Sequence, residues 1–267
     1  MKKGELPSKA TEVCWALARQ TLPSDVVIVG VGTPLAAIAA LLARDVLHPN
    51  LTVLFGTAID PKSFDLAASL FDSSVVANCA VGNYSQIEVL DYLARGGVTL
   101  QFVSPLEIDR QGNLNVSRVL NDDGTWRRFA GSLAIPDTAA LVGRLVAYRV
   151  DHDRRFFPDR VAFVSGAAPD DRRLGPRHIG HGALTAITAR ATVRLGSTPA
   201  VLEYQGEREG IEEEFGFSVD IGSACHRAAI PSEVLKALNR IDPLNVRGME
   251  QRSTRDTTIA RLLARTP

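Results

Sequence analysis

The sequence is poor in cysteine, has no excess of either charge and contains no long apolar run. Cys14, Cys79 and Cys225 are odd in number and far apart, which fits free thiols in a reducing cytoplasm better than disulfides or zinc ligands. Thirty basic and thirty acidic side chains cancel, so nucleic acid is not expected as a partner. A membrane-spanning helix needs about 18 or more consecutive apolar residues, and the sequence has no such run.

Targeting and metal-binding signals are absent as well. The first seven residues carry charges with no apolar segment behind them, unlike a signal peptide. The five histidines show no metal-binding spacing. We expect His178 and His181 in a glycine-punctuated surface loop over residues 170–182 rather than at a metal site. The sequence therefore predicts a cytoplasmic protein with no bound metal and no membrane contact.

Alternating strand and helix patterns indicate an α/β protein. Strands are expected at 25–29, 50–55, 75–79, 99–103, 144–150, 183–189, 191–195 and 200–204, and helices at 8–22, 35–47, 84–94, 207–215 and 232–240. Such alternation predicts a mostly parallel, doubly wound sheet. A length of 267 residues fits either one large α/β domain or two small ones.

A glycine turn joins the first strand to the helix that follows it. The turn reads Gly30-Val-Gly-Thr-Pro34, and in such turns backbone amides and a helix N-terminus can face an anion. Gly30, Gly32 and Thr33 are therefore candidate binding residues, although glycines also permit a tight turn without any ligand. A dinucleotide site is not expected, because the third glycine and the acidic residue of that motif are missing.

The least ordinary stretch of the chain follows the strand at 99–103. This strand ends at Ser104-Pro105, a polar turn containing Asp109 and Asn113 follows, and a second short strand is expected at 114–119. Open α/β sheets bind ligands at the carboxyl ends of their strands, so Ser104, Glu107 and Asn113 are candidate site residues on the same edge as the glycine turn. The alternative is an ordinary corner with solvated acids.

Several of these motifs resemble those of one enzyme family. Ile108-Asp-Arg-Gln-Gly-Asn-Leu-Asn115 is similar to the "(I/V)DxxGNxN" run in β subunits of family I coenzyme A (CoA) transferases, the glutaconate and 3-oxoacid CoA-transferase group. The Gly30–Pro34 turn resembles a "GxGxP" turn of these subunits. Residues 151–157 resemble "HEKRRFV", and residues 241–244 resemble the start of "IDPLGLR". The matches run in the family's order from about residue 11 to residue 248.

This resemblance implies a fold, a substrate class and a partner. We expect one domain over residues 1–248 with the CoA-transferase (NagB/RpiA-like) fold, an open, mainly parallel sheet with helices on both faces. Residues 249–267 would form an amphipathic tail. The family implies an α-subunit-like partner chain, a site between the two chains, an acyl-CoA thioester as substrate and no bound cofactor. Arg154 and Arg155 match the family motif and could contact CoA phosphates, or could simply bridge to Asp153 or Asp159.

The chain departs from the family at the catalytic position. Transferase β subunits carry a glutamate after the second strand, where it forms a glutamyl-CoA thioester, but here the sequence reads Phe55-Gly-Thr-Ala58. Asp60 is the only nearby carboxylate. A family branch of steroid ring-opening hydrolases also lacks this glutamate, so hydrolysis of a CoA ester or of a C–C bond is as consistent with the sequence as CoA transfer. A second departure is Ala134–Ala140, where the family has a glycine-rich "GSGGA" segment.

Glu107 is the candidate catalytic residue, since the family has glutamine at this point and a carboxylate could act as general base. It could also face solvent or pair with a neighbouring arginine. Two other functions fit the same fold: a non-catalytic partner subunit, and a small-molecule-binding protein or sugar-phosphate isomerase.

Overall fold

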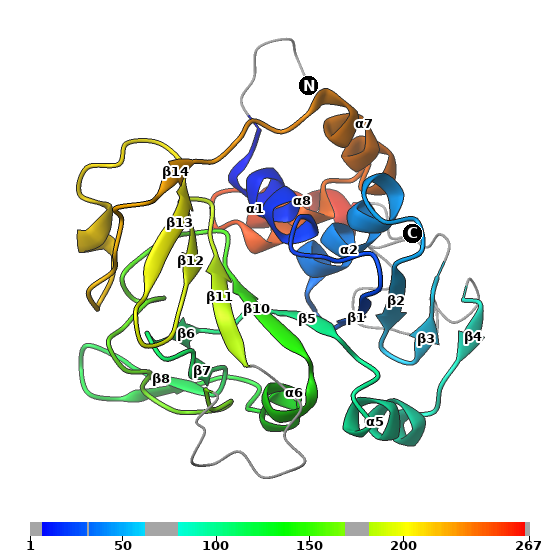
Figure 1. Cartoon of the computed structure of the whole chain (residues 1–267), viewed down its shortest axis with the longest axis horizontal. Helices are drawn as coiled ribbons and strands as arrows, with labels where there is room; N and C mark the ends of the chain where they lie inside the picture. Colours follow the sequence, from blue (N-terminus) through cyan, green and yellow to red (C-terminus); the bar gives the residue numbers. More distant parts are fainter. Residues whose placement is uncertain (1–6, 31, 62–79, 169–181, 265–267) are drawn as a thin grey trace.

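The computed structural model describes residues 7–30, 32–61, 80–168 and 182–264 (Figure 1). The strand expected at 75–79, Cys79, His178 and His181 lie outside the described residues. Cys14 and Cys225 are free thiols, as predicted. No helix in the described part of the chain is long and apolar enough to cross a membrane.

Five parallel strands form the centre of a sheet that has ten strands among the described residues (Figure 1). Their order is β11-β10-β5-β1-β2, and each pairs in parallel with its neighbours. Their bounds are β1 Val26–Val29, β2 Thr52–Phe55, β5 Leu100–Val103, β10 Arg144–Tyr148 and β11 Ala183–Ile187. All five lie within segments that the sequence predicts as strands, and the mainly parallel α/β sheet is confirmed.

Shorter strands extend the sheet on both sides. β3 Ala58–Ile59 and β4 Gly82–Asn83 continue it in antiparallel fashion beyond β2. On the other side β12 Ala191–Arg194 and β13 Ala200–Tyr204 are antiparallel, and β14 Cys225–His226 pairs in parallel with β13. The turns between β2 and β3 and between β12 and β13 are too short for a crossover, so only antiparallel pairing is available to them.

Two small antiparallel ribbons stand apart from the main sheet: β6 Glu107–Ile108 with β7 Leu114–Asn115, and β8 Arg118–Leu120 with β9 Trp126–Arg128. The single strand expected at 114–119 is therefore wrong. The buried Asn115 side chain explains the break, because its Oδ1 accepts from the Ser117 and Arg118 amides at 3.0 and 3.3 Å. Such side-chain bonds to the local backbone compete with strand pairing.

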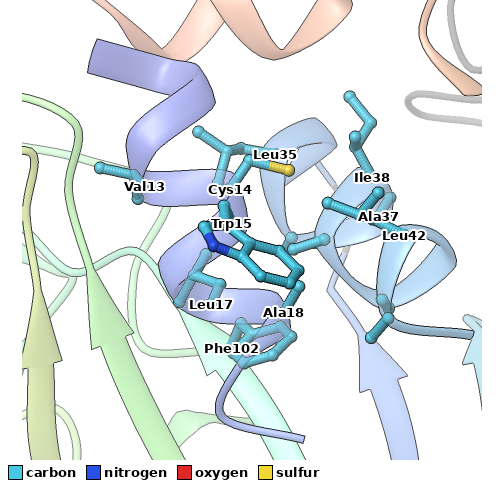
Figure 2. Close-up of a cluster of buried hydrophobic side chains, with 14 of the residues drawn as sticks. Val13, Cys14, Trp15, Leu17, Ala18, Leu35, Ala37, Ile38, Leu42 and Phe102 are labelled. Carbon is cyan, nitrogen blue, oxygen red and sulfur yellow. The ribbon is translucent and has the colours of Figure 1, made fainter. Parts of the chain in front are cut away.

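Helices α1 Lys9–Ala18, α2 Pro34–Val46 and α7 Ser232–Ile241 form one layer over the sheet. Ser8 caps α1 by accepting from the Thr11 amide at 3.3 Å. The alanines of α2 let α1 pack closely against it, and the two helices bury one contiguous core. The Trp15 ring lies between them, close to Phe102 of β5 (Figure 2).

The opposite face of the sheet carries α5 Gln86–Ala94, α6 Ile135–Leu141, the β6–β7 ribbon and a second apolar core. Four phenylalanines dominate this core: Phe156, Phe157, Phe215 and Phe217. Helices therefore cover both faces, as expected from the resemblance.

One expected helix differs from the structure, and another helix exposes most of its apolar residues. The helix expected at 207–215 is only the short 3₁₀ helix η1 Ile211–Glu214, because Gly210 adopts a left-handed conformation (φ 74°) immediately before it. The helix expected at 84–94 forms as α5, but its apolar residues Ile87 and Leu90 are 79% and 53% exposed, and only Leu93 is buried.

The C-terminal segment packs against the helical layer. The 3₁₀ helix η2 Val246–Glu250 contacts α1 and α2, and α8 Arg255–Leu263 packs on η2. The boundary expected between residues 248 and 249 falls inside η2, and the division into a domain and a tail stays a prediction.

Candidate functional site

The glycine turn and the start of the loop after β5 lie at the same edge of the sheet, as predicted. β1 and β5 are parallel neighbours, with Val27 opposite Leu100 and Ile28 opposite Gln101. The Gly30–Pro34 turn after β1 and Ser104 after β5 therefore lie at the same edge of the sheet, the carboxyl edge at which such sheets bind ligands. Ser104 is exposed there.

The backbone of this turn has a conformation that favours glycine at position 32. Gly32 has φ 73°, a left-handed value that is costly for residues with a Cβ. The Thr33 hydroxyl donates to the Gly30 carbonyl at 2.6 Å and closes the turn, and α2 begins at the next residue, Pro34. Thr33 therefore shapes the turn and does not cap the helix with its side chain.

Gln101 lies directly beneath this turn. A Cβ added to Gly30 would come within 3.8 Å of Gln101 Nε2. The Gln101 side chain is buried, and its Oε1 has no hydrogen-bond partner among the residues that the structure describes. Buried amide oxygens are nearly always paired, so an open acceptor here is consistent with a bound molecule at the turn.

Sequence reasoning missed Glu250. Its Oε1 accepts from the Leu35 amide at 2.8 Å, in the first turn of α2, and from the Tyr148 hydroxyl at 3.2 Å. A protein carboxylate therefore occupies part of the helix N-terminus that the sequence indicates as a candidate anion-binding position. No local pattern reveals this contact, because 215 residues separate its partners in the chain.

Burial raises the pKa of Glu250 from 4.5 to about 7, and the hydrogen bonds from Leu35 and Tyr148 and the charge of Arg255 oppose this rise. Because the pKa of Glu250 is raised in the native state, its carboxyl group ionises at a lower pH in the unfolded chain than in the native protein. The native state should therefore lose up to about 3 kcal/mol of stability between pH 4.5 and 7 through this group.

Glu250→Gln removes this ionisation and keeps an acceptor oxygen for Leu35. The stability of the variant relative to the parent should therefore increase by about 1–3 kcal/mol between pH 4.5 and pH 8. Urea unfolding of the parent and the variant at both pH values measures how their difference in free energy of unfolding changes with pH. The contributions of the other titrating groups are the same in both proteins and cancel in this comparison. A difference that does not change with pH would show that Glu250 ionises normally.

The end of β2 carries no carboxylate. Phe55 pairs with Ala58 across a two-residue hairpin turn between β2 and β3, so Gly56 and Thr57 form the turn at the end of β2. Asp60 lies back along the hairpin, where its amide donates to the Val53 carbonyl at 2.8 Å and its carboxylate pairs with Arg44 at 2.5 Å. Asp60 is thus engaged away from the carboxyl end of β2.

Asp109 and Asn113 hold the loop between β6 and β7 together. Asp109 Oδ1 accepts from the Gln111 and Asn113 amides at 3.1 and 3.0 Å. The Asn113 side chain donates to Asp109 Oδ2 at 2.9 Å and accepts from the Ala168 amide at 2.8 Å. The motif over residues 108–115 therefore has a structural explanation in this chain, and both polar groups of the Asn113 side chain are occupied.

Glu107 is held by the same ribbon. Its Oε2 accepts from Asn115 Nδ2 at 2.7 Å and from the Ala162 amide at 2.8 Å. These contacts favour a structural role, and the catalytic role stays a prediction. Arg154 and Arg155 are exposed, and Arg155 lies 3.8 Å from the equally exposed Asp122, a pair of little energetic weight.

The structure thus brings Gly30, Gly32, Thr33 and Ser104 to one edge, and it adds Gln101 and Glu250. Glu107 and Asn113 belong to the β6–β7 ribbon, and the two arginines are exposed side chains of the loop after β10. Among the described residues no group of three or more histidine, cysteine or acidic side chains could hold a metal ion.

Two characterised proteins align with most of the chain. The B chain of glutaconate CoA-transferase from Acidaminococcus fermentans is 23% identical over 242 residues, which cover 85% of this chain and 90% of that protein. The B chain of 3-oxoadipate CoA-transferase from Pseudomonas knackmussii is 26% identical over 239 residues, with the same coverage. No protein-family model matches the sequence.

Solved structures show the same fold. The decarboxylase AibA/AibB superposes with a TM-score of 0.78 at 23% identity, over 91% of this chain and 98% of the matched chain. Glutaconate CoA-transferase from A. fermentans gives 0.75 at 19% identity, over 88% and 94%. IpdAB from Rhodococcus jostii RHA1 gives 0.72 at 20% identity, over 91% and 98%.

The fold and the alignments together define the class of protein. The chain has the CoA-transferase fold, and its homologues are B subunits of CoA-transferases. The resemblance predicted from the sequence is confirmed.

Proposed function

We propose that this chain is the β-type component of a heteromeric enzyme that acts on an acyl-CoA. The observation that carries the proposal is the meeting of the Gly30–Pro34 turn and Ser104 at the carboxyl edge of a CoA-transferase fold. In this proposal Gly30, Gly32, Thr33 and Ser104 form this chain's side of the acyl-CoA site, and the open Gln101 oxygen accepts a hydrogen bond from the ligand.

The second part of the proposal concerns the reaction. A glutamyl-CoA intermediate requires a carboxylate that can form an acyl anhydride, and the hairpin at Phe55–Ala58 offers none. We therefore propose a reaction in which CoA is never covalently attached to this chain. Two reactions meet this condition: hydrolysis of a CoA ester or of a C–C bond, and CoA transfer through a carboxylate of the partner chain. The decarboxylase AibA/AibB has the same fold, so proteins with this fold are not restricted to CoA transfer.

The partner is the third part of the proposal. The matched structure is named as a pair, AibA/AibB, and the matched relatives are named as B subunits. Purification of the tagged chain from its own cells, followed by native mass spectrometry, should yield a heteromer with a chain of CoA-transferase α type. A monomer or homo-oligomer that turns over no acyl-CoA would favour the alternative of a small-molecule-binding protein, and an inactive heteromer would favour a non-catalytic partner subunit.

No covalent glutamyl-CoA adduct is expected on this chain. The complex is incubated with an acyl-CoA, and intact mass and peptide mapping of both chains are measured without hydroxylamine, which would retain a CoA adduct, and with hydroxylamine, which would convert it to a hydroxamate and release CoA. A hydroxamate or a CoA-sized adduct on the partner alone agrees with the proposal. The same modification mapped to this chain, on Asp60 or any other carboxylate, would show that it supplies the nucleophile after all.

Glu107→Gln restores the residue that the family has at this position and keeps an acceptor for Asn115 and Ala162. With the carboxylate already held by these two donors, acyl-CoA turnover by the complex should stay within about threefold of the parent, under roughly 0.7 kcal/mol. A loss of a hundredfold or more with unchanged thermal stability would instead establish Glu107 as the general base.

A further inference from the structure

A cavity of about 640 Å³ opens at the β11–β14 end of the molecule. Its charged and polar walls come from the start of α1 (Lys9, Glu12), the loop after β10 (His152), the turn after β11 (Arg190), the residue after β13 (Gln205), η1 (Glu214), and β14 with the residue after it (His226, Arg227). Among the described residues, none that we assign to the acyl-CoA site lines it.

A buried histidine, His152, lines the cavity. The His152 side chain is 4% exposed, and its Nδ1 lies 2.8 Å from the Thr188 hydroxyl. Its Nε2 lies 3.4 Å from Glu214 Oε2 and has no hydrogen-bond partner in the part of the chain that the structure describes. Burial lowers the pKa of His152 to about 4, despite the opposing charge of Glu214, so the ring is neutral near pH 7.

A neutral imidazole has one N–H and one lone pair. If Nδ1 carries the proton, Nε2 needs a donor from outside the chain; if Nε2 carries it, it needs an acceptor better placed than Glu214. A hydroxyl group satisfies either tautomer, because it both donates and accepts. Native proteins rarely leave such a buried atom unpaired, so the open nitrogen points to a hydroxylated ligand.

The cations of the cavity point to an acid. Arg227 is fully buried, and its Nη atoms donate to the Thr188 carbonyl at 3.2 Å and to the Thr192 hydroxyl at 3.0 Å. Its Nε is 3.6 Å from Glu203 and has no hydrogen bond among the described residues. Glu203 is itself shared with Arg19, at 2.6 Å.

Arg190 pairs with Glu214 through Nε at 3.0 Å and donates to the Gln205 carbonyl through Nη1. Its Nη2 makes no hydrogen bond to another described residue and can donate to a ligand. Counting the lining groups, Lys9, Arg190 and Arg227 supply three positive charges and Glu12 and Glu214 supply two negative ones. The surplus of one positive charge matches a monoanion. The remaining walls include the small or apolar residues Pro7, Ala189, Gly206 and Ala229, which suit a short carbon chain.

We infer that this cavity binds a small hydroxycarboxylic acid, with the carboxylate facing Arg190 and Lys9 and the hydroxyl against His152 Nε2. The site is separate from the acyl-CoA site in its residues. It lies at the same carboxyl edge of the sheet, since His152 follows β10 and Arg190 follows β11. The inference goes beyond the proposed function and does not depend on acyl-CoA turnover.

Calorimetric titration of the purified full chain, with its partner if one co-purifies, tests the inference with two probes, 3-hydroxybutyrate and butyrate. The parent should bind 3-hydroxybutyrate at least tenfold more tightly than butyrate. His152→Phe keeps a ring against Phe157 and Phe215 and removes the ring nitrogens, so it should reduce this preference to less than about threefold while butyrate binding is unchanged.

Charge variants test the carboxylate end. Lys9→Gln should weaken both acids about threefold or more, whereas Lys236→Gln, the same change on the exposed face of α7, should not alter either. Binding should persist in Gly32→Val, which separates this site from the acyl-CoA turn. The inference is overturned if neither acid binds below 10 mM, or if His152→Phe and Lys9→Gln both leave the two affinities unchanged.

Discussion

Arg247→Met is expected to lower the free energy of unfolding by about 3–5 kcal/mol, because it leaves a buried carboxylate without its partner. The Asp242 side chain has no solvent exposure, and its Oδ2 accepts from Arg247 Nη1 at 2.7 Å. The same guanidinium donates through Nε to the Thr11 hydroxyl of α1 at 3.1 Å. The pair therefore ties the C-terminal segment to the helical layer.

Protonation limits this loss. Burial already raises the pKa of Asp242, and Arg247 opposes the rise. Without the arginine the carboxyl group would protonate at a higher pH, so the cost is capped by the free energy of binding one proton. The backbone amides of Val246 and Arg247, at 2.6 and 3.2 Å from the carboxylate, remain as donors.

The matched control is Arg240→Met, which removes the 2.5 Å ion pair between Arg240 on α7 and Asp45 on α2. Arg240 is 64% exposed, so the loss should stay below about 1 kcal/mol. Urea unfolding at pH 7 compares the two variants. Equal losses would show that the Asp242–Arg247 pair is not the anchor of the C-terminal segment.

Gly32→Val is expected to lower acyl-CoA turnover by the assembled complex at least a hundredfold. Valine is strained at φ 73°, by about 1–3 kcal/mol, so the turn must move. Gly30 and Thr33, which the 2.6 Å hydroxyl–carbonyl bond connects, would move with it. A displacement of about 1 Å in a substrate-positioning loop is enough for a loss of this size.

Gly124→Val is the control for backbone strain alone. Gly124 has φ 81° and open space where a Cβ would be added, in the exposed turn between β8 and β9. Both variants should lose similar stability, but only Gly32→Val should lose turnover. Comparable turnover in the two complexes would remove the Gly30–Pro34 turn from the acyl-CoA site.

Much of the fold could be predicted because its signals are local. The apolar runs that form β1, β2 and β5 and the helical periodicity of α1 and α2 lie within short windows, and parallel pairing of β1 and β5 then brought their two loops together. The strand expected at 114–119 failed because the Asn115 side chain competes with the ladder, and the helix at 207–215 failed because of the left-handed Gly210.

The site was predictable only in part. The glycine turn and Ser104 could be predicted as site residues because each follows the end of a predicted strand. Glu250 could not, because it contacts Leu35 from a position 215 residues away in the chain. Gln101 is a single polar residue within an apolar strand, and only the structure shows that its Oε1 has no partner among the described residues. His152 lies in the segment 151–157, in which the family motif indicates Arg154 and Arg155 as candidate binding residues but gives no role to the histidine. The role of His152 follows only from the structure, in which Glu214 of η1 and Thr188 after β11 lie beside its ring nitrogens.

The most direct test of the proposed function is acyl-CoA turnover by the reconstituted heteromer, compared with each chain alone. Consumption of acyl-CoA is followed by chromatography with short-chain acyl-CoA substrates, with and without a carboxylic acid acceptor. The proposal predicts turnover by the heteromer that neither chain shows alone. Full turnover by the partner chain without this one, or none by the heteromer with any of the acyl-CoA substrates, would contradict it.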